Sequence, residues 1–101
     1  MPSIDGAAVR TIVIACDAGM ASSVLMSAQL RKQLAPQVVV RHSPVDALPA
    51  EADVVLTHDK LSVRARSVAG DRPVVAYTQL VGDPAVAGLV HAIRQGGQIT
   101  A

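Results

Sequence analysis

The chain contains four short runs of apolar, largely β-branched residues, and this pattern limits its fold more than any other feature. The runs cover residues 9–15, 37–41, 52–57 and 73–77. Short apolar runs bounded by turn residues are typical of strands buried inside a parallel sheet. Helical patterns at 22–34, 60–68 and 84–95 alternate with these runs. This alternation predicts an α/β domain with a four-stranded parallel sheet and helices on both faces.

Capping residues mark the predicted helix boundaries. Asp83 followed by Pro84 has the chemistry of an N-cap and a first helical position, and Asp59 is expected to cap the middle helix. The first helix is expected to begin at Ser22 or Ser23. Its predicted buried side carries Val24, Leu25, Ala28 and Leu34.

The connections and the ends complete the predicted domain. In the loop 44–49, Val45 and Leu48 are expected to cover the core. Residues 1–8 and 96–101 are expected to be loose, so the prediction is a single domain, 1–101, with an ordered core at about 9–95.

Composition excludes several classes of protein. The chain has one cysteine, so it forms no internal disulfide, and no cofactor or metal is expected, because His42 and His91 lack any ligand geometry. No apolar run approaches the ~20 residues of a membrane span, and the N-terminus does not resemble a signal peptide. Nine basic and eight acidic residues, with Tyr77 as the sole aromatic side chain, argue against nucleic-acid binding. We expect a cytoplasmic protein that is not itself inserted in a membrane.

The cysteine lies where function is expected. Ligands of open α/β sheets bind beyond the carboxyl ends of the strands, and Cys16 directly follows the first predicted strand. Gly19 and its small neighbours allow a tight turn whose N–H groups form an anion-binding nest at a helix N-terminus. Such a nest favours a thiolate before reaction and a phosphoryl group afterwards. A small buried apolar side chain is the other interpretation of Cys16, and the residues alone leave both open.

The loop after the first strand also resembles a known motif. The run is Cys16, Asp17, Ala18, Gly19, Met20, Ala21, Ser22 and Ser23. It resembles the phosphorylation loop Cys-Asp-Ala-Gly-Met-Gly-Ser-Ser of mannitol-type enzyme IIB components of the bacterial phosphoenolpyruvate-dependent sugar phosphotransferase system (PTS). Seven of the eight positions agree, and Ala21 replaces the family's glycine. Residues 30–32 and 52–61 are also similar to the family.

This resemblance implies a fold and an activity. The implied fold is a Rossmann-like α/β domain, similar to low-molecular-weight tyrosine phosphatase. The implied activity is that of a phosphotransferase, in which Cys16 takes a phosphoryl group from a phosphohistidine of enzyme IIA. Cys16 then passes the group to a sugar or sugar alcohol bound by the membrane enzyme IIC, at the inner face of the membrane. The loop Asp17 to Ser23 would hold the phosphate. Apart from the resemblance, the ends of the other predicted strands bring Thr57, His58, Thr78 and Gln79 to the same edge as Cys16. His58 is therefore an accessory candidate, and a surface histidine without a role is the other interpretation.

Two alternatives stay open from the sequence. One is a IIB-like regulatory module of a transcription activator. The other is a phosphatase, although its Cys-x5-Arg loop would need arginine where this chain has Ser22, and no basic residue lies between Arg10 and Arg31. The pair Asp83–Pro84 is similar to the phosphatase acid loop, but a helix cap is the favoured interpretation. Arg64 and Arg66 are interpreted as a solvated helix face.

Overall fold

The computed structural model describes residues 3–16, 22–34, 36–79 and 82–100. Its helices and strands are β1 (Ser3–Asp5), β2 (Thr11–Cys16), α1 (Ser22–Leu34), β3 (Val39–Pro44), β4 (Val54–His58), α2 (Ser62–Ala69), β5 (Val74–Tyr77), α3 (Pro84–Gln95) and β6 (Gln98–Thr100). Three single-turn 3₁₀ helices, η1 (Gly6–Ala8), η2 (Val45–Ala47) and η3 (Asp59–Leu61), lie in the connections.

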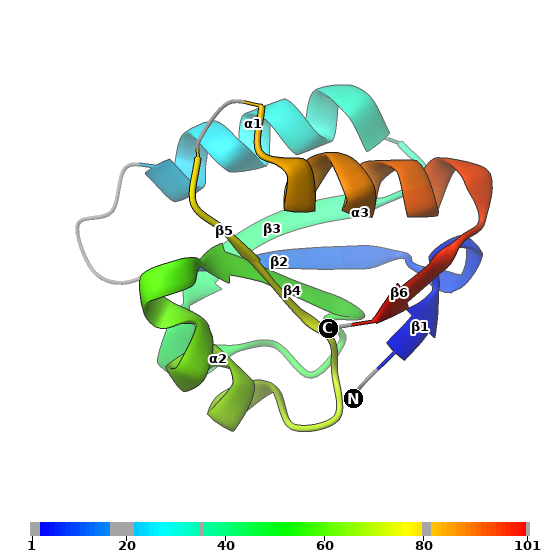
Figure 1. Ribbon diagram of the computed structural model, residues 1–101. Coiled ribbons are helices and arrows are strands. Elements are labelled where there is room, and N and C mark those ends of the chain that lie inside the picture. The colour runs from blue at the N-terminus through cyan, green and yellow to red at the C-terminus, as the bar shows by residue number, and fades with distance from the viewer. Residues whose placement is uncertain (1–2, 17–21, 35, 80–81, 101) are drawn as a thin grey trace.

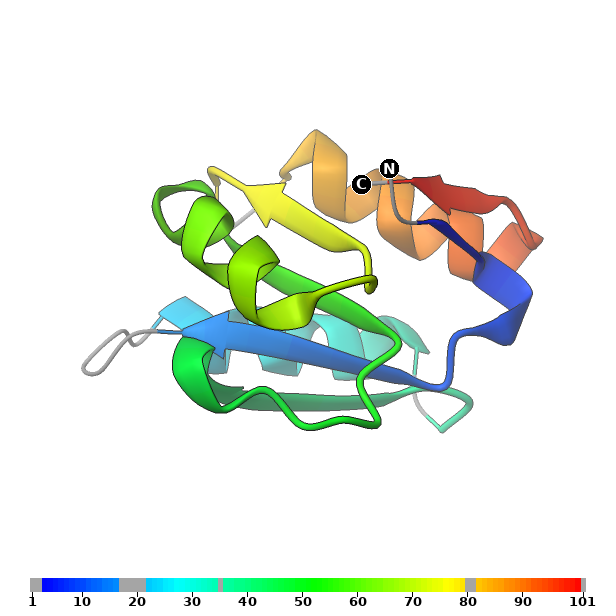
Figure 2. The same ribbon diagram turned by 90° about the horizontal axis from the view of Figure 1, so that it is seen from below.

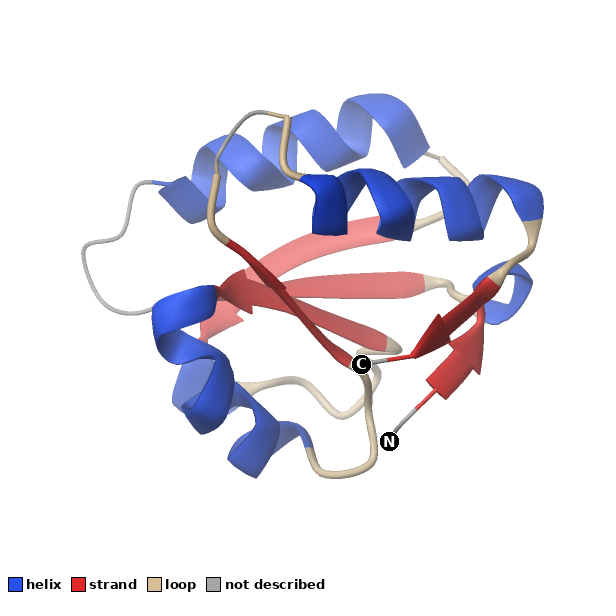
Figure 3. Ribbon diagram, viewed as in Figure 1, coloured by secondary structure: helices blue, strands red, loops and turns tan. Residues whose placement is uncertain are grey.

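The predicted parallel sheet is confirmed. Its strands lie in the order β3-β2-β4-β5, and every neighbouring pair runs parallel. Helices α1 and α3 cover one face of the sheet and α2 covers the other (Figures 1 and 3). The chain therefore folds as the predicted α/β, Rossmann-like domain. None of the helices in the described part of the chain is both long and apolar enough to cross a bilayer.

Alternation along β2 builds a core on each face of the sheet. Ile12 and Ile14 belong to the larger cluster, which includes residues of α1 and α3. Val13 and Ala15 belong to the smaller cluster, beneath α2. All four side chains are buried, so β2 lies in the interior on both faces, as expected for a central parallel strand. Val45 is also buried and Leu48 packs against the smaller cluster, which confirms the predicted role of their loop.

The predicted inner face of α1 is largely wrong. Val24 and Leu25 are 55% and 53% exposed, and Ala28 is exposed as well. The buried apolar residues are Met26, Leu30 and Leu34, of which only the last was on the predicted face. These three are spaced four residues apart and form one stripe along the helix. The sequence of α1 offers two apolar stripes, and the stripe with the larger side chains packs on the sheet.

The two ends of the described chain pair with each other. Strands β1 and β6 form a two-stranded antiparallel sheet in which Ile4 lies opposite Ile99, and Figure 2 shows them side by side. The Gly6 N–H donates to the Gly97 carbonyl at 2.7 Å. A Cβ at Gly6 would lie 2.0 Å from the carbonyl oxygen of Ala92, so only glycine fits this contact. Residues 3–5 and 98–100 thus form a paired sheet between segments distant in sequence, within the ends (1–8 and 96–101) that the sequence analysis expects to be loose.

Candidate functional site

Cys16 is the last residue of β2 rather than the first residue beyond it. It lies opposite Pro44 of β3, and its side chain is half-buried. The Cys16 thiol donates a hydrogen bond to the carbonyl oxygen of Ser43, with a sulfur–oxygen distance of 3.4 Å. The sulfur is therefore neither deep in the core nor fully in solvent. It lies where the central strand opens toward the loop.

The strand order makes this edge a natural ligand site. The chain runs from β2 to β3 on one side, and β4 pairs with β2 on the other, so the sheet reverses its direction of winding between β2 and β4. Open α/β sheets bind ligands at such a switch point, beyond the carboxyl ends of the strands. The parallel registers bring His58 to the same edge as Cys16, as predicted, and Tyr77 lies opposite His58 in the register.

Thr57 supports the end of β2 from the neighbouring strand. It is fully buried, and its hydroxyl donates to the carbonyl oxygen of Ala15 at 3.1 Å. That carbonyl belongs to the peptide bond that joins Ala15 to Cys16. Sequence analysis predicts Thr57 at this edge but not its hydrogen bond. A buried threonine that ends an apolar strand is the available signal, because a buried hydroxyl requires a partner.

His58 has a defined orientation. Its Nδ1 accepts a hydrogen bond from the Lys60 N–H at 3.2 Å, and the ring lies edge-on to Tyr77 with 5.6 Å between ring centroids. Because Nδ1 accepts, the hydrogen of the neutral imidazole is on Nε2, so the ring can donate from that nitrogen. His58 is thus the N-cap of η3. Asp59 lies inside η3 and does not cap α2, which corrects the prediction from sequence.

Asp83 is a helix cap, as predicted. One carboxylate oxygen accepts from the N–H groups of Ala85 and Val86, and the other accepts from the N–H groups of Thr78 and Gln79. Burial by itself raises the pKa of this carboxyl, but the four backbone donors outweigh burial and hold the pKa below its usual value. Asp83 is therefore an ionised acceptor that joins the end of β5 to the start of α3.

The predicted phosphate-holding loop is described only at its two ends. Asp17, Ala18, Gly19, Met20 and Ala21 lie outside the described residues. Ser22 and Ser23 are the first two residues of α1, so their backbone N–H groups lie at its N-terminus. These groups have no partner within the helix itself, and they add to the positive end of its dipole.

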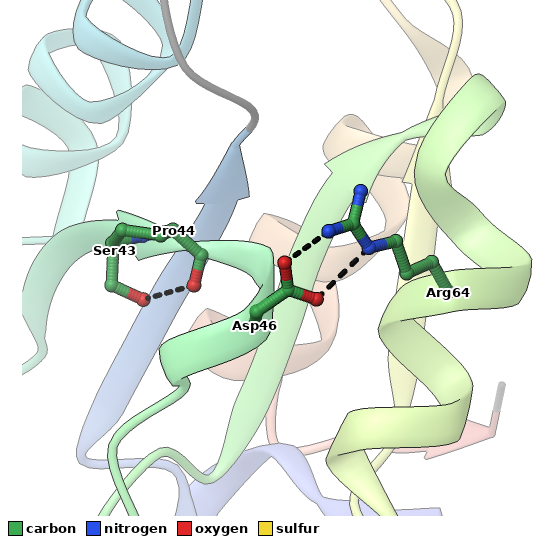
Figure 4. A network of polar contacts seen from close by, with 4 residues as sticks. All are labelled: Ser43, Pro44, Asp46 and Arg64. Carbon is green, nitrogen blue, oxygen red and sulfur yellow. Dashed lines mark hydrogen bonds and ion pairs between the residues drawn. The ribbon is translucent and has the colours of Figure 1, made fainter.

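An ion pair lies close to the same edge. Arg64 of α2 donates from Nε to Asp46 Oδ1 at 2.9 Å and from a terminal NH₂ to Oδ2, which gives a two-pronged contact. Figure 4 shows this pair with Ser43 and Pro44, near the end of β2. Arg64 is therefore not simply part of a solvated helix face. Across the described ranges, no three His, Cys, Asp or Glu side chains gather as a metal site would require.

Comparisons with known proteins identify the family of this chain. The family model described as "PTS system, Lactose/Cellobiose specific IIB subunit" matches residues 11–89. A mannitol-specific cryptic EIICB component of Escherichia coli K12 is 37% identical over 79 residues, which are 75% of this chain and 17% of the relative. The mannitol-specific EIICBA component of Vibrio cholerae is 44% identical over 66 residues, which are 62% of this chain and 10% of the relative.

The mannitol-specific EIICB component of Bacillus subtilis is 29% identical over 90 residues, which are 86% of this chain and 19% of the relative. This chain thus spans less than a fifth of the length of each of these three relatives. The family match covers most of the chain and contains β2, Cys16 and the carboxyl edge of the sheet. The chain belongs to the IIB family of the PTS.

Proposed function

We propose that this chain is a PTS phosphocarrier whose phosphorylated residue is Cys16. The phosphoryl group comes from a phosphohistidine of an enzyme IIA and goes to a sugar or sugar alcohol bound by a membrane enzyme IIC. The curated relatives are named mannitol-specific, which favours a mannitol-like acceptor. Their names also join the B component to a C component, which favours a place for this chain at the cytoplasmic face of the membrane.

The position of Cys16 is the observation that carries this proposal. Its sulfur is half-buried at the carboxyl end of the central strand, where a partner has access, and the chain continues from there toward the start of α1. The N–H groups at the start of α1 favour negative charge. Residues 17–23 would complete the cradle that holds the phosphoryl oxygens.

The transfer consists of two balanced displacements. In the first, the sulfur of Cys16 attacks phosphorus and gives up its proton to solvent. The S–P bond forms as the P–N bond of phosphohistidine breaks, and the electron pair of that bond stays on the imidazole nitrogen. In the second, a sugar hydroxyl oxygen attacks phosphorus, its proton leaves, and the sulfur departs as a thiolate. Both steps need donors around the equatorial oxygens.

Two features favour a carrier over a hydrolase. The sequence supplies no arginine in the loop after Cys16 to hold the phosphoryl group for attack by water. Asp83, the residue similar to a phosphatase acid, is an ionised helix cap with both oxygens engaged by N–H donors, so it is unsuited to protonating a leaving group. His58 lies at the same edge and its Nδ1 accepts from the Lys60 N–H, which leaves Nε2 as its donor, and we assign it an accessory role toward the phosphoryl group.

The test is phosphoryl transfer from a phosphorylated mannitol-type enzyme IIA. Wild-type protein is expected to gain one phosphoryl group, measured by intact mass, and Cys16→Ser is expected to gain none while keeping the same melting temperature. Membrane vesicles with enzyme IIC and mannitol should then remove the group from the wild type. Phosphorylation of Cys16→Ser, or steady Cys16-dependent hydrolysis of an aryl phosphate, would contradict a pure carrier role.

A further inference from the structure

We propose that Arg64 is a positioning residue for Cys16, and that it acts by neutralising Asp46. Only the part of this inference that concerns phosphorylation of Cys16 rests on the proposed function. The inference also concerns the free thiol, and that part can be tested without any partner protein.

The path from the sulfur to this ion pair is short. The thiol of Cys16 donates to the carbonyl of Ser43 at 3.4 Å, and Asp46 is only three residues further along. Three residues span at most about 10 Å when the chain is extended. The distance is shorter here, because the chain turns into the 3₁₀ helix η2. The carboxylate of Asp46 therefore lies near the site of an anion, whether that anion is a thiolate or a phosphocysteine.

A bare carboxylate at this position would oppose both anions. Two like charges about 10 Å apart change an equilibrium about twofold at the dielectric constant of water, and about fifteenfold at the lower effective value typical of a protein surface. The forked contact with Arg64 places a positive charge directly on both oxygens of Asp46. The pair therefore presents no net charge to Cys16. This compensation matters because the sequence supplies no basic residue between Cys16 and Arg31.

The ion pair is not required to hold η2 in place. Val45, the residue before Asp46, is buried in the same cluster as Ala65 and Ala69 of α2. The side chains of Arg64 and Asp46 are 50% and 61% exposed. Removing either charge should therefore leave the fold intact, because exposed ion pairs contribute little to stability. The expected effect is on the charge around Cys16.

The chain supplies a matched control. Arg41 of β3 pairs with Glu51, and these side chains are 53% and 58% exposed. This second pair has the same chemistry and exposure, but Glu51 precedes β4 and so belongs toward the opposite end of the sheet from Cys16. Arg41→Gln removes a surface arginine from an ion pair without changing the charge next to the sulfur.

The experiment measures the rate of Cys16 alkylation at pH 7 in low salt. Arg64→Gln is expected to slow alkylation by about two- to fifteenfold, because Asp46 is then uncompensated. The double variant Asp46→Asn/Arg64→Gln should return to the wild-type rate, and Arg41→Gln should match wild type throughout. The slowing in Arg64→Gln should shrink at 1 M salt, where the Debye length is only about 3 Å. Thermal melting of each variant verifies the fold.

Two results would overturn the inference. One is an Arg64→Gln rate equal to that of Arg41→Gln. The other is a double variant as slow as Arg64→Gln, which would mean that Arg64 acts on the anion itself. Phosphoryl acceptance from phospho-enzyme IIA should follow the same order among the variants. If the wild type accepts no phosphate, the proposed function fails, while the alkylation series still decides the role of Arg64.

Discussion

The hydroxyl of Thr57 donates a hydrogen bond to the carbonyl oxygen of Ala15, one residue before the cysteine, at 3.1 Å, and Thr57 is fully buried. This bond lies at the last register pair between β2 and β4, where Ala15 faces Thr57. It extends the support of the sheet to the peptide that carries Cys16. A buried side chain of β4 thus supports the end of β2, where Cys16 lies.

Two substitutions of Thr57 distinguish the effect of this hydrogen bond from the effect of side-chain packing. Thr57→Val keeps the shape but removes the donor, and should cost about 1 kcal/mol of unfolding free energy. Thr57→Ser keeps the donor but loses a methyl group, at a similar cost of about 0.8 kcal/mol. We expect Thr57→Val alone to slow phosphoryl acceptance by Cys16. Urea unfolding and transfer kinetics measure the two effects, and equal kinetics in the two variants would assign Thr57 a purely structural role.

Asp83 should make stability depend on pH. Its pKa is lower in the folded state than the usual value of an aspartate, so its contribution is present above the unfolded pKa and is lost as pH falls through the folded pKa. Asp83→Asn cannot accept at both oxygens, and should cost about 1.5–3 kcal/mol at pH 7. The cost should shrink below pH 4. Urea unfolding from pH 2 to 7 measures it, with exposed Asp71→Asn as control; a pH-independent cost would contradict the charged cap.

The sequence predicts the sheet and its helices because each of these segments carries its own local signal. Apolar runs and the Asp83–Pro84 cap define elements without any knowledge of the rest of the chain. Contacts between distant segments were not predictable in this way. The pairing of β1 with β6 joins two three-residue strands from opposite ends of the chain, and the only signal is one isoleucine between polar residues in each.

The same holds for the site: features with a local sequence signal were predictable, and contacts between distant segments were not. The motif around Cys16 is local and identifies the family. The alternation of strands and helices predicts a parallel sheet, but not the order β3-β2-β4-β5 of its strands. The observed end of β3 lies at Pro44, not at residue 41 as predicted, and this shift is what brings the Ser43 carbonyl to the thiol. The ion pair between Asp46 and Arg64 joins side chains 18 residues apart, and nothing in either segment indicates it.

Two glycines should respond in opposite ways to the same substitution. Gly6→Ala would place a Cβ 2.0 Å from the Ala92 carbonyl oxygen, and should cost about 1–3 kcal/mol by displacing β1 from β6. Gly88→Ala in α3 meets nothing within 4 Å, and should gain about 0.5–1 kcal/mol from helix propensity. Thermal or urea unfolding tests both. Equal stability of Gly6→Ala and wild type would show that the ends are not held by this contact.

Two leucines of α1 test which face packs on the sheet. Leu30→Ala removes a fully buried side chain and should cost about 2–5 kcal/mol, whereas Leu25→Ala, at a position 53% exposed, should change stability by less than about 0.5 kcal/mol. Chemical unfolding of both variants gives the comparison. A larger loss for Leu25→Ala than for Leu30→Ala would reverse the orientation of the helix.

The most direct test of the proposed carrier role is to locate the phosphoryl group on the chain. After transfer from phospho-enzyme IIA, the protein is digested under conditions that preserve phosphocysteine, and the peptides are sequenced by tandem mass spectrometry. We expect the group on Cys16 and on no other residue. A phosphoryl group on His58, His42 or His91 instead, with Cys16 unmodified, would contradict it.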